Sequence, residues 1–427
     1  MHNATAPRSV PQQAATGAAR PRRTLRIILL AALCWAATVV LACLFGPFHI
    51  AVGDVLRALG QLALPGAFTD MAGSAPDATH MLVVTRIRLA RVCLALLAGG
   101  GLAVAGTVFQ GVLRNPLADP FTLGVSGGAA FGASLALTLG IGPLAAWLTL
   151  HLPAFAALSP QALLPLAALA GALASLGAVL LLGGAAGGGS FRRETVVLAG
   201  VVVSTVLSAL VSLVKALDEE SVSSIVFWIM GSLQGRGWAH AAVLLPWLAL
   251  GLLLVLPRFR ELDILALGDV QARQLGMDTA RVRLQLLVGA SLITAGCVAV
   301  SGVIGFVGLV VPHLARMRLG ASHGPLLAAG WFGGGVLLAW ADVLARTLLP
   351  GGAELPVGVV TALLGGPFFC LLLVRGERGA TGRTMGRTMG RTTGGMTGGM
   401  TGRTTSQPTA QTAPQTTTGT GCTGGAS

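Results

Sequence analysis

The sequence predicts an all-α polytopic membrane protein, built as a bundle of about ten transmembrane helices. Apolar residues make up 54% of the 427 residues and charged residues only 10%, whereas a soluble domain carries about 25% charged residues. Apolar stretches of about 20 residues, the length that crosses a bilayer, recur along the chain. The 61 glycines are typical of closely packed membrane helices, because small residues let backbones approach.

Each predicted span is an apolar run that a more polar segment separates from the next. In chain order the spans are predicted at 24–45, 88–110, 121–141, 161–184, 194–217, 240–257, 284–303, 305–319, 326–349 and 356–374. The run after Arg22 and Arg23 is similar to a secretion signal, but nine further spans follow, so we interpret it as the first membrane helix. The segment 47–87 is too polar to span and is expected outside.

Composition divides the chain into three predicted regions. Residues 1–23 are rich in Ala, Pro and Arg and are expected to form a disordered tail. Residues 24–376 form the transmembrane domain, which includes a charged loop at 258–283. Residues 377–427 repeat Thr-Met-Gly-Arg and then run through Thr, Gly and Gln, so this low-complexity tail lacks the apolar content to fold.

The net charge of +13 is compatible with a nucleic-acid partner, but the positions of the charges argue against one. With the N-terminus placed inside, 21 Lys and Arg residues fall in inside segments and 7 in outside segments. This is the positive-inside bias of a polytopic membrane protein. We therefore expect both termini and the 258–283 loop in the cytoplasm, lipid around the spans, and no nucleic acid.

Motifs for catalysis are absent from the sequence. It has no G-x-x-x-x-G-K-[ST] phosphate loop, no H-E-x-x-H zinc motif and no G-x-S-x-G nucleophile turn. The six cysteines show no metal-ligand spacing. We predict no catalytic residue, metal or bound cofactor on this chain.

The 258–283 loop holds nine of the chain's forty-three Asp, Glu, Lys and Arg residues. Within it, Asp269 opens a short predicted helix, and Gly268 and Gly276 stand on either side. A folded, charged surface between membrane spans is expected to contact a partner.

Three arginines, Arg86, Arg88 and Arg91, cluster at the predicted outer end of the second span, and Arg346 lies at the outer end of the ninth. They are either snorkelling anchors at helix ends or a docking site for an acidic surface, since arginine pairs with carboxylates in a bidentate manner. Asp342 precedes Arg346 by four residues, so a neutralising pair within one helix is expected.

Two polar features are candidates for a translocation path. Asn115 and Pro116 belong to a proline-broken segment between the second and third spans, which is either a plain turn or irregular backbone that water reaches. Ser204, Ser208 and Ser212 fall on one face of the fifth span. That stripe serves either helix packing through serine hydrogen bonds or a hydrophilic path.

Glycines recur at every third position between the seventh and eighth spans. Gly302, Gly305 and Gly308 weaken a helix there, and Pro312 disrupts it further. We predict a hinge or a short broken helix.

These segments, taken in order, resemble the permease subunits of bacterial ABC importers for iron-siderophores, haem and vitamin B12. The resemblance runs from about residue 24 to 376. It rests on R-x-R-L-x-R, N-P-L-A-x-P-x-x-L-G-x-S, L-A-L-G-x-x-x-A-R-Q-L-G, G-x-I-G-F-V-G-L-V-x-P-H, A-D-x-x-A-R and E-L-P-V-G. Ala90 stands where the family usually has proline.

The resemblance implies a permease that pairs with a second permease subunit, identical or paralogous, in the bacterial inner membrane. It implies that a cytoplasmic ATPase dimer, which carries ATP and Mg, docks on Leu265, Gly268, Asp269, Ala272, Arg273, Gln274, Leu275 and Gly276. It also implies that a periplasmic binding protein docks on Arg88, Arg91 and Arg346. The expected cargo is an iron-siderophore complex, with haem or cobalamin as the alternative.

Two further classes remain open from the residues alone. A secondary transporter driven by an ion gradient would need buried carboxylates that titrate, and only Asp342 lies well inside a span. An intramembrane enzyme would need a nucleophile, base or metal cluster, and the sequence shows none.

Overall fold

The computed structural model describes residues 20–46, 50–63, 78–140, 160–188 and 191–371, with isolated positions between 142 and 151. The described part of the chain forms helices and turns and holds no strand. The predicted C-terminal tail, 377–427, and residues 1–19 of the predicted N-terminal tail lie outside the described residues.

A helix is present at each of the ten predicted spans. In chain order these helices are α1 (Arg20–Leu44), α4 (Leu89–Leu113), α5 (Val125–Leu139), α7 (Pro160–Ala186), α8 (Arg193–Leu217), α10 (Trp238–Val255), α13 (Thr279–Ser301), α14 (Val307–Leu319), α15 (His323–Thr347) and Val357–Leu371. Among the described residues, six helices are long and apolar enough to cross a membrane. The apolar helices Leu29–Leu44, Val125–Leu139 and Val357–Leu371 are shorter. The fold class is therefore the predicted all-α polytopic bundle.

Shorter helices connect the spans at both ends of the bundle. They are α2 (Val52–Ala63), α3 (Ala78–Leu82), η1 (Val83–Arg88), η2 (Pro120–Leu123), α9 (Val222–Ile229), η4 (Leu256–Arg258), α11 (Phe259–Leu267), α12 (Asp269–Gln274) and η5 (Pro350–Gly352). The segments α3, η1 and α4 run on as one helix from Ala78 to Leu113.

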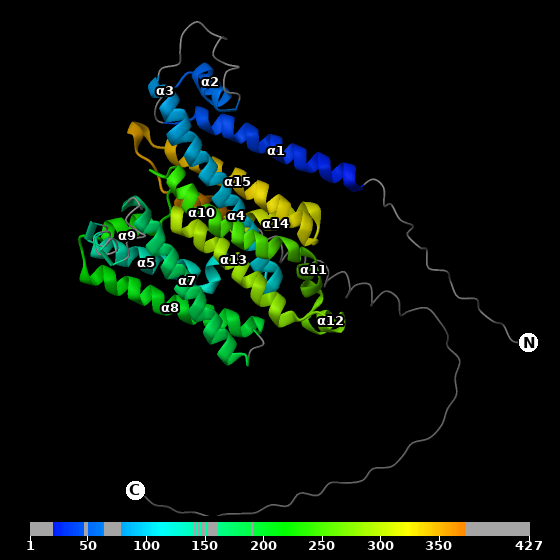
Figure 1. Cartoon of the computed structure of the whole chain (residues 1–427). Coiled ribbons are helices and arrows are strands. Elements are labelled where there is room, and N and C mark those ends of the chain that lie inside the picture. Colours follow the sequence, from blue (N-terminus) through cyan, green and yellow to red (C-terminus); the bar gives the residue numbers. More distant parts are fainter. Residues whose placement is uncertain are drawn as a thin grey trace, which may run out of the picture. The chain divides into compact units, whose positions relative to one another are not determined.

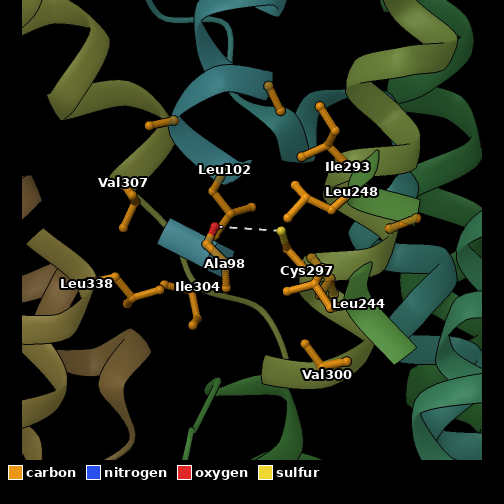
Figure 2. Packing of buried hydrophobic residues seen from close by; sticks show 14 of the residues in the cluster. Ala98, Leu102, Leu244, Leu248, Ile293, Cys297, Val300, Ile304, Val307 and Leu338 are labelled. Atoms are coloured by element: carbon orange, nitrogen blue, oxygen red, sulfur yellow. Dashed lines mark hydrogen bonds between the residues drawn. The ribbon is translucent and has the colours of Figure 1, made fainter. Parts of the chain in front are cut away.

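The central helix of the bundle is α4, which packs against α10, α13, α14 and α15 (Figure 1). Of its most apolar stretch, 89% is buried. Figure 2 shows Ala98 and Leu102 of α4 among apolar side chains of the surrounding elements, namely Leu244, Leu248, Ile293, Cys297, Ile304, Val307 and Leu338. The Cys297 thiol donates a hydrogen bond to the Ala98 carbonyl oxygen at 3.6 Å. The core therefore consists of apolar side chains that surround α4.

Glycines bring the backbones of neighbouring helices into contact. A Cβ atom on Gly106 of α4 would overlap the Gly308 carbonyl oxygen of α14, and one on Gly99 would overlap the Gly334 carbonyl oxygen of α15. No side chain separates these helices at those points. This close approach is the role predicted from the glycine content.

The chain breaks between α13 and α14, where a short broken helix was predicted. Gly302 has φ of +71° and Phe306 has φ of +67°, so both occupy the left-handed region, and Pro312 lies inside α14. Gly302 can carry no side chain, because a Cβ there would overlap the Trp228 carbonyl oxygen. The broken helix is present, and its action as a hinge stays a prediction.

The helices alternate in direction, so the bundle has two ends of different composition. At the end we call the Asp269 end, α11 and α12 meet the C-terminus of α4 and the N-termini of α13 and α15. At the Arg91 end, Glu354 contacts Arg91 near the N-terminus of α4, and the residues that follow α9 bond to the end of α13; Figure 1 shows α9 and α12 at opposite ends. Most charged residues of the described spans lie toward these ends.

Candidate functional sites at the two ends of the bundle

The loop that follows α10 is a folded unit. Gly268, with φ of +132°, separates α11 from α12, and Gly276, with φ of +81°, follows α12. Leu265 and Ala272 are buried and attach the two short helices to the bundle. The short helix predicted between the two glycines is α12.

The exposed face of this unit combines apolar side chains with polar and charged ones. Leu267, Val270 and Leu275 expose 64%, 63% and 65% of their surface, although they lie outside the predicted spans. Arg273 and Gln274 are exposed beside them. Exposed apolar side chains that cluster and are rimmed by polar ones mark an interaction surface. We call these five residues the coupling face.

Asp269 binds α12 to two membrane helices. Arg283 of α13 donates from Nη2 to both Asp269 carboxylate oxygens at 2.9 Å. Arg114, just after α4, donates from Nη2 to the same carboxylate at 2.6 Å and from Nε to the Leu265 carbonyl oxygen at 2.8 Å. Arg283 also donates to the Phe191 carbonyl oxygen, next to α8, at 3.1 Å. Displacement of α12 would therefore pull on α4, α13 and the start of α8.

Two arginines hold the Asp269 carboxylate in its charged form. Partial burial disfavours the charge, but the hydrogen bonds and positive charge of Arg283, with the charges of Arg114 and Arg273, outweigh it and lower the pKa of Asp269 below its usual range. The carboxylate is about one third exposed, so solvent screens part of this interaction.

A second link joins the same end to α15. The Asp263 carboxylate of α11 accepts hydrogen bonds from the His323 backbone N–H at 2.8 Å and lies 2.7 Å from His323 Nδ1. This carboxylate from another element caps the N-terminus of α15, where free N–H groups need acceptors. α11 and α12 are thus tied to α4, α13 and α15.

The Arg91 end contains a buried ion-pair network. Arg91 of α4 donates from Nε and Nη2 to Asp342 of α15 at 2.8 to 3.1 Å, and its Nη1 lies 2.8 Å from Glu354 Oε2. Arg346 Nε lies 3.7 Å from Asp342 and makes no hydrogen bond within the described residues. The predicted pair within one helix is therefore the weaker contact. Arg91 is the main partner of Asp342, because packing of α4 on α15 places its guanidinium against the carboxylate.

The arginines predicted to dock a binding protein lie inside the bundle. Arg88, Arg91 and Arg346 expose only 4%, 7% and 3% of their surface. Arg88 donates to the Cys43 carbonyl oxygen at 2.8 Å, and Arg346 donates to the Ala42 carbonyl oxygen at 3.0 Å. Both therefore satisfy carbonyl groups at the C-terminus of α1. Of the three clustered arginines Arg86, Arg88 and Arg91, Arg86 is the exposed one.

The candidate residues for a path lie in two separate places. Asn115 and Pro116 form an exposed turn at the Asp269 end, where Asn115 Oδ1 accepts from the Leu117 N–H at 2.9 Å. On α8, Ser204 is half-buried while Ser208 and Ser212 are exposed, and the Ser212 hydroxyl donates to the Ser208 carbonyl oxygen. The turn is therefore not brought together with the serine stripe. A path role for either set stays a prediction.

Sequence reasoning missed the residues that fix α12. Arg114 and Arg283 were counted only as inside charges, and Asp263 and His323 were not singled out. No sequence signal marked them: Arg114 ends α4 in the left-handed region with φ of +46°, which only the structure reveals. No group of three His, Cys, Asp or Glu residues in the described part of the chain is placed to hold a metal ion.

Comparisons with known proteins agree with this arrangement. A family model described as the FecCD transport family matches residues 32–375. An uncharacterized ABC transporter permease protein of Bacillus subtilis is 38% identical over 82% of this chain and 93% of its own length. A hemin transport system permease protein of Yersinia pestis is 38% identical over 77% of this chain and 95% of its own length. A cobalamin import system permease protein of Halobacterium salinarum is 37% identical over 82% of this chain and 89% of its own length.

A solved structure gives the same fold. It is an ABC transporter assigned to the metal-chelate type, in an inward-facing conformation. It matches this chain with a TM-score of 0.66 and 30% identity, over 82% of this chain and 99% of its own.

Removing the acceptor from the Arg91 network should destabilise the bundle. We expect Asp342→Ala to lower the free energy of unfolding by about 3 to 5 kcal/mol, because it leaves buried arginines uncompensated. SDS titration in micelles, followed by circular dichroism, measures this change. The double variant Arg91→Met/Asp342→Leu should recover only part of the loss, because Glu354 and Arg346 then lack their partners. Glu194→Ala, which breaks an exposed pair with Arg193, is the control and should cost at most about 1 kcal/mol.

Removing the charge of Asp269 should loosen α12. We expect Asp269→Asn to speed amide hydrogen exchange in α12, while Arg273→Gln, which changes a nearby charge without removing a hydrogen bond of Asp269, should not. Because the folded pKa is lowered, the stabilisation is present above about pH 4 and is lost as pH falls through the folded pKa. Exchange in the wild-type α12, corrected for the intrinsic rate, should therefore not change between pH 6 and 8. A marked change there would contradict the assignment.

Proposed function

The chain belongs to the FecCD transport family of ABC transporter permeases, and from this premise we propose that it carries iron-siderophore complexes across the bacterial inner membrane. The coarser function follows from the family: it is the permease subunit of an importer for iron chelates, haem or cobalamin. The choice of an iron-siderophore cargo is the proposal. It is supported by relatives that act on iron chelates, among them an Fe(3+) dicitrate transport system permease protein of Escherichia coli, 38% identical over 69% of this chain.

The coupling face is the observation that carries the proposed machinery. It offers three exposed leucine or valine side chains on and beside the short helix α12, at the end predicted to be cytoplasmic. The sequence has no phosphate loop of its own, so ATP and Mg belong on a partner ATPase dimer. A second permease subunit and a periplasmic binding protein complete the proposed assembly. The positive-inside bias of the sequence supports a cytoplasmic position for both termini.

The polar contacts at the Asp269 end provide a route for coupling. ATP binding can shift the permease only if the ATPase contacts two arrangements of it differently. A displacement of α12 would act on α4 and α13 through Asp269, and on α15 through Asp263 and His323. These contacts join a small surface helix to three helices of the core. The proposed coupling therefore needs no flexible linker between the ATPase and the bundle.

Haem or cobalamin remains the alternative cargo, because relatives with those names are equally similar. The structure favours an ATP-driven importer over a secondary transporter. The single carboxylate well inside a span, Asp342, is fixed by Arg91 through three hydrogen bonds. A proton-coupled carrier needs a carboxylate that can change its charge during the cycle.

Reconstitution tests the proposed function directly. The permease, its ATPase and its binding protein are placed in proteoliposomes, and uptake of a ferric siderophore, haemin and cobalamin is measured with and without ATP. ATP-dependent uptake of the ferric siderophore alone supports the proposal. Uptake of haemin or cobalamin instead would assign the alternative cargo, and uptake driven by a proton gradient without the ATPase would contradict the whole machinery.

Placing a charge on the coupling face should release the ATPase. We expect Val270→Glu to reduce co-purification of the ATPase at least about tenfold, because a buried unpaired charge costs more than 1.4 kcal/mol. Leu62→Glu is the matched control, since Leu62 is 59% exposed on α2, remote from α12. Pull-down from detergent extracts gives the measurement. Equal loss in both variants would indicate a general defect instead of a lost contact.

The exposed outer arginine should contribute to docking of the binding protein. We expect Arg86→Glu to weaken docking several-fold at low salt and less at high salt, because salt screens exposed charges. Arg193→Glu, the same change at the Asp269 end, is the control. Surface plasmon resonance measures both. Arg88→Gln tests the buried arginines separately. If this variant loses docking while its free energy of unfolding is unchanged, the predicted docking role of the buried arginines is supported.

A further inference from the structure

A polar cavity opens at the Arg91 end, apart from the coupling face. Its volume is about 260 Å³. Side chains from α9, the loop before α10, the end of α13 and the segment before Val357–Leu371 line it, chiefly Trp228, Ser232, Gln234, Arg236, Ser301 and Glu354. The pocket therefore lies where four elements meet at one mouth of the bundle.

The walls of this pocket hold donors without acceptors. Trp228 is only 7% exposed, and its indole N–H has no hydrogen-bond partner among the described residues. The same is true of the Arg236 Nε–H group. Buried donors are nearly always paired in folded proteins, because an unpaired one loses its hydration without replacement. Both donors belong to residues that line this one cavity, and neither has an acceptor among the described residues.

The charge of the pocket is positive. Arg236 forms no ion pair within the described residues, and its Nη1 lies 3.0 Å from His240 Nε2. Burial lowers the pKa of Arg236 below its usual value, but arginine stays charged in proteins. The acid in the lining, Glu354, lies 2.8 Å from Arg91 and is neutralised by it. One cation is thus left for a ligand.

The backbone around the pocket is fixed before any ligand arrives. The Ser232 N–H donates to the Ser301 carbonyl oxygen at 2.8 Å, and the Gly358 N–H donates to the Gly231 carbonyl oxygen at 3.2 Å. Gly231, with φ of +72°, lies so close to Val303 that a Cβ would overlap its carbonyl oxygen. Because this backbone is held in place, the pocket can bind an anion without reorganisation of the site.

We propose that this pocket binds an anionic oxygen group, a carboxylate above all, on the iron chelate that the permease transports. The Arg236 guanidinium supplies the charge, and the Trp228 indole N–H supplies a neutral donor beside it. The cavity is smaller than the roughly 300 to 1,000 Å³ of pockets that enclose a whole small molecule. It therefore takes one arm of the chelate and holds it at the mouth. This inference rests on the proposed function.

Binding to the purified permease alone tests the proposal. Isothermal titration calorimetry in detergent is run with ferric citrate, with inorganic phosphate and with an uncharged ferric trihydroxamate. We expect ferric citrate to bind and the uncharged chelate to bind at least tenfold more weakly, since a charge-assisted hydrogen bond is worth about 1.5 to 3 kcal/mol. Arg236→Gln should weaken ferric citrate binding about tenfold or more. Trp228→Phe, which removes the N–H and keeps an aromatic ring, should weaken it about threefold or more.

Matched controls separate recognition from folding. Trp238→Phe is the control for the indole, because the Trp238 N–H already donates to the Thr85 carbonyl oxygen outside the pocket; its affinity should equal that of the wild type. Wild-type affinity in both Arg236→Gln and Trp228→Phe would overturn the proposal. Phosphate binding as tight as ferric citrate would also overturn it, since the pocket would then be a general oxyanion site. The calorimetry contains no ATPase and therefore tests the pocket alone. If the permease binds ferric citrate but the reconstituted system shows no ATP-driven uptake, the result counts against the proposed machinery and not against the pocket.

Discussion

The ion pair between Arg91 and Asp342 is the contact on which the Arg91 end of the bundle depends. Charges inside a membrane protein are tolerated where they are paired, and here Asp342 is 1% exposed. The pair joins α4 to α15, the two helices that also touch backbone to backbone at Gly99 and Gly334. Glu354 extends the network to the segment before the last helix. Correct pairing of these groups therefore fixes how α4 lies against α15.

The two ends of the molecule use the same chemistry for different purposes. At the Arg91 end, Arg88, Arg91 and Arg346 are buried and bound to carboxylates or to carbonyl groups of α1. At the Asp269 end, Arg114 and Arg283 grip a half-exposed carboxylate on a helix that projects from the bundle. Burial makes the first set rigid, whereas partial exposure leaves the second accessible to a partner. Between them lies an apolar core that transmits displacement because it is tightly packed.

Local patterns in the sequence predicted the local structure well. Apolar runs predicted a helix at each span, and the glycines on either side of Asp269 predicted α12. Contacts between distant residues were beyond such patterns. The four-residue spacing suggested Arg346 as the partner of Asp342, but helix packing brings in Arg91, 251 positions away. The burial of the predicted docking arginines and the grip of Arg114 on Asp269 have the same origin: each depends on which helices become neighbours.

The distribution of charge has an electrical consequence. Charged side chains lie toward the two ends of the described spans, and Asp342, which lies farther inside α15, is paired with Arg91. A charge must cross part of the transmembrane field before the membrane potential can do work on it, at about 2.3 kcal/mol per elementary charge per 100 mV. Rocking of such helices carries almost no protein charge through that field. The voltage across the membrane should thus have little effect on the equilibrium between different arrangements of the bundle.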